Sequence, residues 1–259
     1  MSSENQENSR NKIAIITGGG RGLGRNTVIS LARRGVNVIL TYNTNKAEAE
    51  DAVAEIEAAG AKAVALQLDT GNSASFDAFV ASVRQALEAF GAKDFDYLVN
   101  NAGTSYHASI AETTEEAFDG LVNVHLKGVF FLTQKLLPLM ADGGRIINIS
   151  SGLARFSVPG SSAYAAMKGA VEVFTRYLAK ELGARGITAN TVAPGAVMTD
   201  FSGGIVRDNP VVNKMVSDMT ALGRPGVADD IGPMIASLLA DDNRWVNGQR
   251  IEVSGGAAL

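Results

Sequence analysis

The stretch that decides the fold is Thr17-Gly18-Gly19-Gly20-Arg21-Gly22-Leu23-Gly24, a glycine-rich turn between two differently patterned segments. An apolar, β-branched run at residues 13–17 precedes it, and helical spacing at residues 23–34 follows it. Glycines let a backbone approach a pyrophosphate closely, and the first turn of a helix offers its free N–H groups to phosphates. The stretch therefore predicts a dinucleotide-binding strand–turn–helix unit, with a simple tight turn as the alternative.

The alternation of strand and helix continues along the whole chain. Apolar or β-branched runs predict strands at residues 13–17, 36–40, 63–67, 97–100, 145–150, 188–192 and 250–253. Helical spacing predicts helices at residues 23–34, 46–59, 73–90, 114–140, 162–182 and 228–240, with Pro138 bending or ending the fourth late. Runs that are apolar throughout are typical of parallel strands covered on both faces. We therefore predict an α/β fold of one domain, a doubly wound, Rossmann-like parallel sheet of seven strands.

Composition narrows the classes of partner and site. The chain of 259 residues has a net charge of −4, no cysteine and two histidines. It lacks the basic clusters of a nucleic-acid-binding protein, the thiolates of a disulfide framework or zinc site, and an apolar run long enough for a membrane. Residues 1–11 are polar and aperiodic, without the apolar core of a signal peptide. We expect a disordered tail there, a catalytic domain at residues 12–259, no metal, and a cytoplasmic location.

One long connection interrupts the pattern. Residues 195–226 are rich in glycine and proline and hold only a short helical pattern near residues 211–219. Long connections inside a compact domain are often mobile and functional. We predict a substrate lid at residues 195–226.

The end of the second predicted strand indicates which nucleotide is preferred. In dinucleotide folds an acid at this place accepts hydrogen bonds from the adenosine ribose 2′-OH, but here Tyr42 and Asn43 stand instead. A 2′-phosphate would meet no repulsion, and Arg21 can pair with it. The sequence favours NADP(H), with NAD(H) still possible; alternatively, Arg21 is an ordinary surface charge.

Tyr164 and Lys168 lie four residues apart in the predicted helix at residues 162–182, so they share one face. A nearby cation favours a phenolate and lowers the pKa of tyrosine from its ordinary value near 10. The pair by itself also fits an ordinary amphipathic helix. Ser151 strengthens the reading, because it follows a predicted strand, and ligands of open parallel sheets bind beyond the carboxyl ends of the strands.

With these motifs in order, the chain resembles the short-chain dehydrogenase/reductase family in its compact form, close to the 3-oxoacyl-carrier-protein reductases. The resemblance runs from Lys12 to the C-terminus and rests on Thr17, Gly18, Gly22, Gly24, Asp69, residues 100–103, Asn123, Ser151, Tyr164, Lys168, Pro194, Gly195 and Thr199. It implies hydride transfer between a nicotinamide cofactor and a carbonyl or secondary alcohol, and a homo-oligomer, commonly a tetramer.

The resemblance also implies a role for each matching residue. Tyr164 would be the acid/base, Ser151 would hold the reacting oxygen, Lys168 would lower the tyrosine pKa, and Asn123 would anchor a proton-relay water. Asn123 could instead bond only to its helix, and Asp69 could be a loop acid rather than an adenine ligand. The cofactor-binding residues expected are Gly18, Arg21, Gly22, Leu23, Gly24, Tyr42, Asn43, Asp69, Thr70, Asn101, Ala102, Gly103, Tyr164, Lys168, Pro194, Gly195, Val197 and Thr199.

Apolar residues near these motifs suggest a hydrophobic small-molecule substrate. The expected substrate contacts are Ser151, Leu153, Phe156, Tyr164 and Phe201, with Tyr106, Gly152 and Met198 nearby. Phe156 and Phe201 could instead pack beneath loops. Two other functions stay open: a cofactor-binding regulator or scaffold without turnover, which would not need the four catalytic residues, and a sugar-nucleotide epimerase, which usually carries an extra C-terminal domain.

Overall fold

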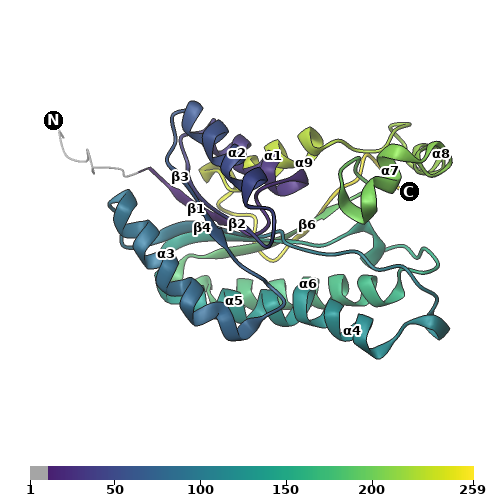
Figure 1. Ribbon diagram of the computed structural model, residues 1–259, viewed down its shortest axis with the longest axis horizontal. Coiled ribbons are helices and arrows are strands. Elements are labelled where there is room, and N and C mark those ends of the chain that lie inside the picture. The colour runs from purple at the N-terminus through teal and green to yellow at the C-terminus, as the bar shows by residue number, and fades with distance from the viewer. Residues whose placement is uncertain (1–10) are drawn as a thin grey trace.

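A computed structural model describes residues 11–259, so the tail expected at residues 1–11 lies outside the described residues except for Asn11 (Figure 1). Within the described part, seven strands form one fully parallel sheet. Their order across the sheet is β3 (Ala63–Gln67), β2 (Asn37–Tyr42), β1 (Ile13–Ile16), β4 (Phe95–Asn100), β5 (Met140–Ile149), β6 (Thr188–Pro194) and β7 (Arg250–Val253). The predicted doubly wound sheet is confirmed.

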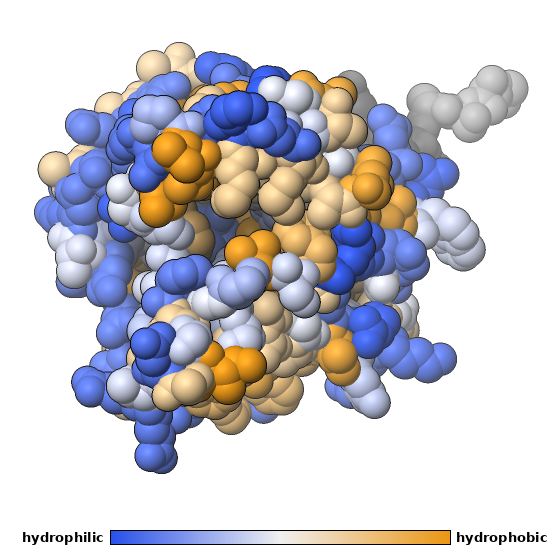
Figure 2. Space-filling view, turned by 90° about the vertical axis from the view of Figure 1, so that its right-hand side faces the viewer, coloured by the Kyte–Doolittle hydropathy of each residue, from blue (hydrophilic) through white to orange (hydrophobic). Residues whose placement is uncertain are grey.

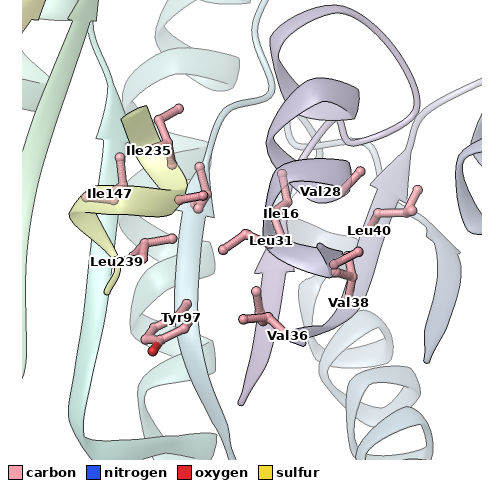
Figure 3. Close-up of a cluster of buried hydrophobic side chains, with 14 of the residues drawn as sticks. Ile16, Val28, Leu31, Val36, Val38, Leu40, Tyr97, Ile147, Ile235 and Leu239 are labelled. Carbon is pink, nitrogen blue, oxygen red and sulfur yellow. The ribbon is translucent and has the colours of Figure 1, made fainter. Parts of the chain in front are cut away.

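Helices cover both faces of this sheet. One layer holds α1 (Gly22–Ala32), α2 (Lys46–Ala58) and α9 (Ala228–Leu238), and the other holds α3 (Phe76–Phe90), α5 (Gly128–Leu136) and α6 (Ser162–Glu181) (Figure 1). Strand β1 serves both layers, because Ala14 and Ile16 join one hydrophobic cluster while Ile13 and Ile15 join the other. This alternation is the two-residue period of a strand buried on both sides. Figure 3 shows the first cluster, in which α1 and α9 pack on the sheet.

The prediction of a single helix at residues 114–140 is wrong. The segment divides into α4 (Glu115–Val122), a π-helical turn at Asn123–Lys127, and α5. In the π-turn the N–H of Gly128 donates to the carbonyl of Asn123, five residues earlier. The wider turn changes which side chains share a face, and apolar spacing in the sequence does not reveal it. A π-turn inside a helix often marks a functional site.

The end of α5 shows the expected effect of Pro138. The helix stops at Leu136, and a short 3₁₀ turn at Leu137–Leu139 leads directly into β5. Strand β5 thus begins at Met140, five residues before the predicted start at residue 145. The register between β4 and β5 shifts near Phe95 and Tyr97, which is the kind of irregularity that sequence alternation cannot predict.

Neighbouring strands β1 and β4 mark the point where the chain's winding direction reverses. In open α/β sheets, ligands bind in the crevice at the carboxyl ends of such strands. At the same edge of the molecule lie α7 (Ile205–Asp208) and α8 (Pro210–Met219) (Figure 1), and α8 matches the pattern predicted near residues 211–219. Among the described helices, none combines the length and apolarity that a membrane span requires.

Candidate active site

The glycine-rich turn is tied to the strands on both sides of it. The amide of Gly18 donates to the Thr41 hydroxyl at 3.1 Å, which joins the turn to the end of β2. On the other side, the Thr17 hydroxyl accepts from the amides of Asn101 and Ala102, each at 2.9 Å, and the Asn101 side chain donates back to the Thr17 carbonyl at 2.9 Å. These bonds fix the turn over the crevice between β1 and β4.

Glycine is required in this turn for two different reasons. Gly18 and Gly22 have φ values of 67° and 54°, a region that side chains other than glycine rarely adopt. At Gly24 the restriction is space, since an added Cβ would lie 2.1 Å from the carbonyl oxygen of Gly18. The first turn of α1 contains no acidic residue and has no side-chain cap. Its amide groups are therefore available to an anion such as a phosphate.

Residues that would meet the adenosine ribose carry no negative charge. Asn43, just past β2, is exposed, and its carbonyl accepts from the Gln67 side chain at 2.9 Å. Arg21 is exposed as well and forms no ion pair with any residue that the structure describes. The amide of Gly19 bonds to the Thr41 carbonyl at 2.9 Å, which keeps the turn beside the end of β2. The guanidinium of Arg21 can therefore pair with a 2′-phosphate, and the end of β2 carries no charge that would repel it.

Asp69 makes a local bond. Its carboxylate accepts from the amide of Gly71 at 2.9 Å and so shapes the loop that follows β3. This is the loop role that the sequence left open. Its side chain is exposed.

The chain after β6 closes the crevice from the other side. Val197 forms a bridge with Gly226, so both ends of the 195–226 segment are held together. A Cβ added at Gly22 would lie 3.7 Å from Cβ of Thr199, which places Thr199 directly opposite the glycine-rich turn. Pro194 ends β6, and the amide of Gly195 donates to the Val253 carbonyl at 3.1 Å. The structure thus brings this predicted group to the crevice.

Ser151, Tyr164 and Lys168 meet beyond the carboxyl end of β5. Ser151 immediately follows Ser150 at the strand end, and its hydroxyl accepts from the amide of Leu153 at 3.2 Å. Tyr164 and Lys168 lie on α6, with Nζ of the lysine 5.5 Å from the centre of the tyrosine ring. The lysine is only 5% exposed and donates to the carbonyl of Ile149 at 2.8 Å.

Burial dominates the electrostatics of this pair. Burial raises the pKa of the Tyr164 phenol well above its ordinary value, and a hydrogen bond with Ser151 only partly opposes this. Burial also lowers the pKa of the Lys168 ammonium to about 8. The role expected of Lys168, to lower the tyrosine pKa, stays a prediction, because in the protein alone burial is the largest influence on the phenol. The opposing influence of Ser151 on this pKa indicates that the two hydroxyls lie close to one another.

His125, in the π-turn, packs against the ring of Tyr164. It is 1% exposed, and its ring meets that of Tyr164 edge to face with 5.2 Å between centroids. Its Nε2 lies 2.8 Å from the carbonyl oxygen of Thr104, while Nδ1 is buried without a partner among the described residues. Burial, with a further contribution from the Lys168 cation, lowers its pKa to about 3, so the imidazole is neutral. An added Cβ at Gly103 would lie 2.8 Å from the ring, which explains the glycine there.

Asn123 begins the π-turn, which packs against α6. Its side chain forms no hydrogen bond with another described residue, so the alternative of a side chain bonded to its own helix is not what the structure shows. The carbonyl of Asn123 accepts from Gly128, five residues on.

The apolar residues divide into two groups. Phe201 faces the site, since its ring lies 6.2 Å from that of Tyr164 and it remains 44% exposed. Tyr106 packs with Tyr164 in a small cluster. Phe156 instead folds back on Gly152, where an added Cβ would lie 2.8 Å from its ring. Figure 2 views the edge that carries α7 and α8 and shows a hollow with apolar residues on its rim.

Sequence reasoning assigned no role to three contributors. Thr17, which opens the glycine-rich motif, is 2% exposed and cross-links the turn through its hydroxyl. Glu172 and Arg250 form an ion pair at 2.7 Å behind Ser150 and Ser151. The position of Arg250, a charged residue in the predicted last strand, was a usable signal. Its partner Glu172 was not predictable in this way, because it lies 78 residues away in the chain.

Comparisons with known proteins agree with the observed fold. A sequence model of the family described as Enoyl-(Acyl carrier protein) reductase matches residues 18–258. The hydroxynaphthalene reductase-like protein Arp2 of Metarhizium brunneum is 35% identical, over 99% of this chain and 98% of its own. The reductase LugOII, described as catalysing keto-reduction at C1 in lugdunomycin biosynthesis, superposes with a TM-score of 0.91 at 39% identity, covering 97% of this chain and all of its own. The ketoreductase LanV, solved with NADP and rabelomycin, superposes with a TM-score of 0.87 at 35% identity, covering 95% of this chain and 96% of its own.

Proposed function

The chain belongs to the short-chain dehydrogenase/reductase family and is an oxidoreductase that interconverts carbonyl and alcohol groups with a nicotinamide cofactor. From that premise we propose that it is an NADP(H)-dependent ketoreductase with Tyr164 as its acid/base. The observation that carries the proposal is the meeting of Ser151, Tyr164 and Lys168 beyond the carboxyl end of β5, at the same end of the parallel sheet as the glycine-rich turn.

Each side chain has a defined task in the reduction of a ketone. NADPH, held by the glycine-rich turn, would supply the hydride for the carbonyl carbon. The Tyr164 phenol donates its proton to the carbonyl oxygen, and the Ser151 hydroxyl donates a hydrogen bond to the same oxygen. The Lys168 ammonium stabilises the phenolate that remains. Asn123 would hold the water through which the proton is replaced. In the oxidative direction every transfer reverses.

The lining favours a flat, apolar ketone. Phe201 presents a half-exposed ring near Tyr164, and Tyr106 adds a second aromatic side chain. The hydroxynaphthalene reductase-like protein Arp2 and LanV, which was solved with rabelomycin, are similar chains. We infer a fused-ring aromatic ketone as the substrate class, with α7 and α8 acting as a lid over it.

A substrate panel tests this function. NADPH oxidation would be followed with tetralones, acyl thioesters, sugars and steroids, and we expect the highest kcat/KM for the tetralones, which are fused-ring aromatic ketones. If NADPH binds but no member of the panel is turned over, a regulator or scaffold without turnover is the better description.

Cofactor preference can be tested at Arg21. Because the guanidinium would pair with the 2′-phosphate, Arg21→Glu should lower kcat/KM for NADPH at least tenfold, on the order of 1.4 kcal/mol or more, and leave that for NADH nearly unchanged. Arg33→Glu, an exposed charge reversal at the other end of α1, is the control. A tenfold preference of the unaltered protein for NADH would contradict the assignment.

We also propose a homotetramer. Apolar side chains remain exposed on the outer face of α5 and α6: Phe130 and Phe131 at 41% and 39%, Val173 at 45% and Tyr177 at 63%. Exposed apolar patches of this kind commonly mark protein interfaces. Light scattering should give about four times 27.0 kDa, and Val173→Glu should lower that mass, whereas Val211→Glu on α8 should not. A monomeric mass for the unaltered protein would exclude the assembly.

A further inference from the structure

Four side chains of alternating charge form a chain of ion pairs behind the catalytic serine. Arg250 Nε lies 2.7 Å from Glu172 of α6, and its Nη1 lies 2.8 Å from Glu252 of β7. Glu252 is held in turn by two nitrogens of Arg155, each at 2.8 Å. The four charges balance, and Glu172, Arg250 and Glu252 are 13%, 24% and 19% exposed, so water screens them less than it screens ordinary surface pairs.

This chain of ion pairs reaches the two residues that follow β5. Glu172 accepts a hydrogen bond from the Ser150 hydroxyl at 2.7 Å. Arg250 donates with its remaining nitrogen, Nη2, to the carbonyl of Ser151 at 3.3 Å. Three nitrogens of one guanidinium therefore hold three acceptors on three elements, an arrangement that the single ammonium of lysine cannot reproduce.

The other end of this chain of ion pairs, at Arg155, contacts the C-terminal residues. Arg155, four residues after Ser151, donates to the carbonyls of Ala257 and Ala258 at 2.7 and 3.2 Å. Ala257 pairs with Thr220, at the end of α8. The loop that carries the serine is thus fixed from both sides.

We propose that Arg250 is a positioning residue that sets the orientation of Ser151 for the reduction, an inference that rests on the proposed function of this site. Ser151 has an extended backbone, with φ −158° and ψ 153°, and opens the short turn at Gly152–Ala154. Its carbonyl is gripped by Arg250 and by the amide of Ala154 at 3.2 Å. Holding this carbonyl and the preceding Ser150 fixes the backbone that carries the Ser151 hydroxyl beside Tyr164. Catalytic groups lose efficiency when small displacements spoil their aim.

Arg250→Met tests this role, with Arg185→Met as the matched control. Arg185 likewise bonds one carboxylate, Asp142 at 2.7 Å, and two backbone carbonyls, but at the opposite end of β5. We expect Arg250→Met to lower kcat for the best ketone at least tenfold, while the Kd for NADPH changes less than twofold. Arg250→Lys should recover part of the loss, and Arg185→Met should keep kcat within twofold. Equal losses of kcat in the two methionine variants would overturn the proposal.

Hydrogen–deuterium exchange gives a second measurement that does not depend on turnover. The amides of residues 153–156 should exchange at least tenfold faster in the NADPH complex of Arg250→Met than in that of Arg185→Met, because the first variant releases the Ser151 carbonyl. Unchanged exchange there would reject the positioning role. An absence of ketone reduction by the unaltered protein would instead reject the proposed function, so the two failures are distinguishable.

Discussion

Tyr164→Phe is expected to lower kcat by roughly a thousandfold while the Kd for NADPH changes less than twofold. General acid–base groups contribute about 10²–10⁴ in rate, and phenylalanine removes the only proton that the ring can donate. The ring itself is retained, so its edge-to-face contact with His125 and its packing near Phe201 persist. The loss should therefore appear in turnover rather than in binding.

Single-turnover reduction and NADPH fluorescence titration measure the two quantities separately. Tyr177→Phe, thirteen residues further along the same helix, keeps the ring on the apolar face of α6 and should retain full activity as the control. A Tyr164→Phe variant with near-normal turnover would remove the phenol from the mechanism. A variant that lost NADPH affinity in parallel with kcat would indicate a structural defect instead.

Lys168→Met is expected to lower kcat roughly a hundredfold and to change how stability depends on pH. The ammonium is the cation nearest to the phenolate that forms, and 332/(εr) at about 5 Å and an effective dielectric of 20 gives roughly 3 kcal/mol. Methionine fills the same volume without the charge. The rate loss reflects the higher energy of the phenolate left after proton transfer.

The pH effect follows from the direction of the lysine shift. Burial lowers the pKa of folded Lys168 to about 8, against 10.5 in the unfolded chain. Between these values the unfolded chain binds a proton that the folded chain does not, so stability rises with pH in that window. Below pH 8 both forms are protonated, and the burial penalty stays constant. The stability of the unaltered protein relative to Lys168→Met should thus rise by up to about 3 kcal/mol from pH 8 to 10.5.

Urea unfolding at several pH values measures this difference, with the exposed Lys180→Met as the control variant. A relative stability that stayed flat across the window would show that Lys168 is not desolvated as described. Full turnover in Lys168→Met would remove its role toward the phenolate.

The fold was predictable because its signals are local. Apolar runs buried on both faces, glycines at the helix ends and the glycine-rich turn all act over a few residues, and the predicted seven-stranded sheet is confirmed. The same locality limited the prediction at residues 114–140. There the π-turn at Asn123–Lys127 depends on packing against α6, which lies far along the chain.

At the site, the turn and the Tyr164–Lys168 pair follow from the sequence, because helical spacing and strand ends set where such residues fall. The surroundings of that pair come from the packing of distant elements: the neutral His125 against the tyrosine ring, the buried lysine, and the guanidinium of Arg250 on the Ser151 carbonyl. Burial and pKa depend on every element packed around a group. Those elements come from distant parts of the chain, so the pattern of any one segment cannot specify them.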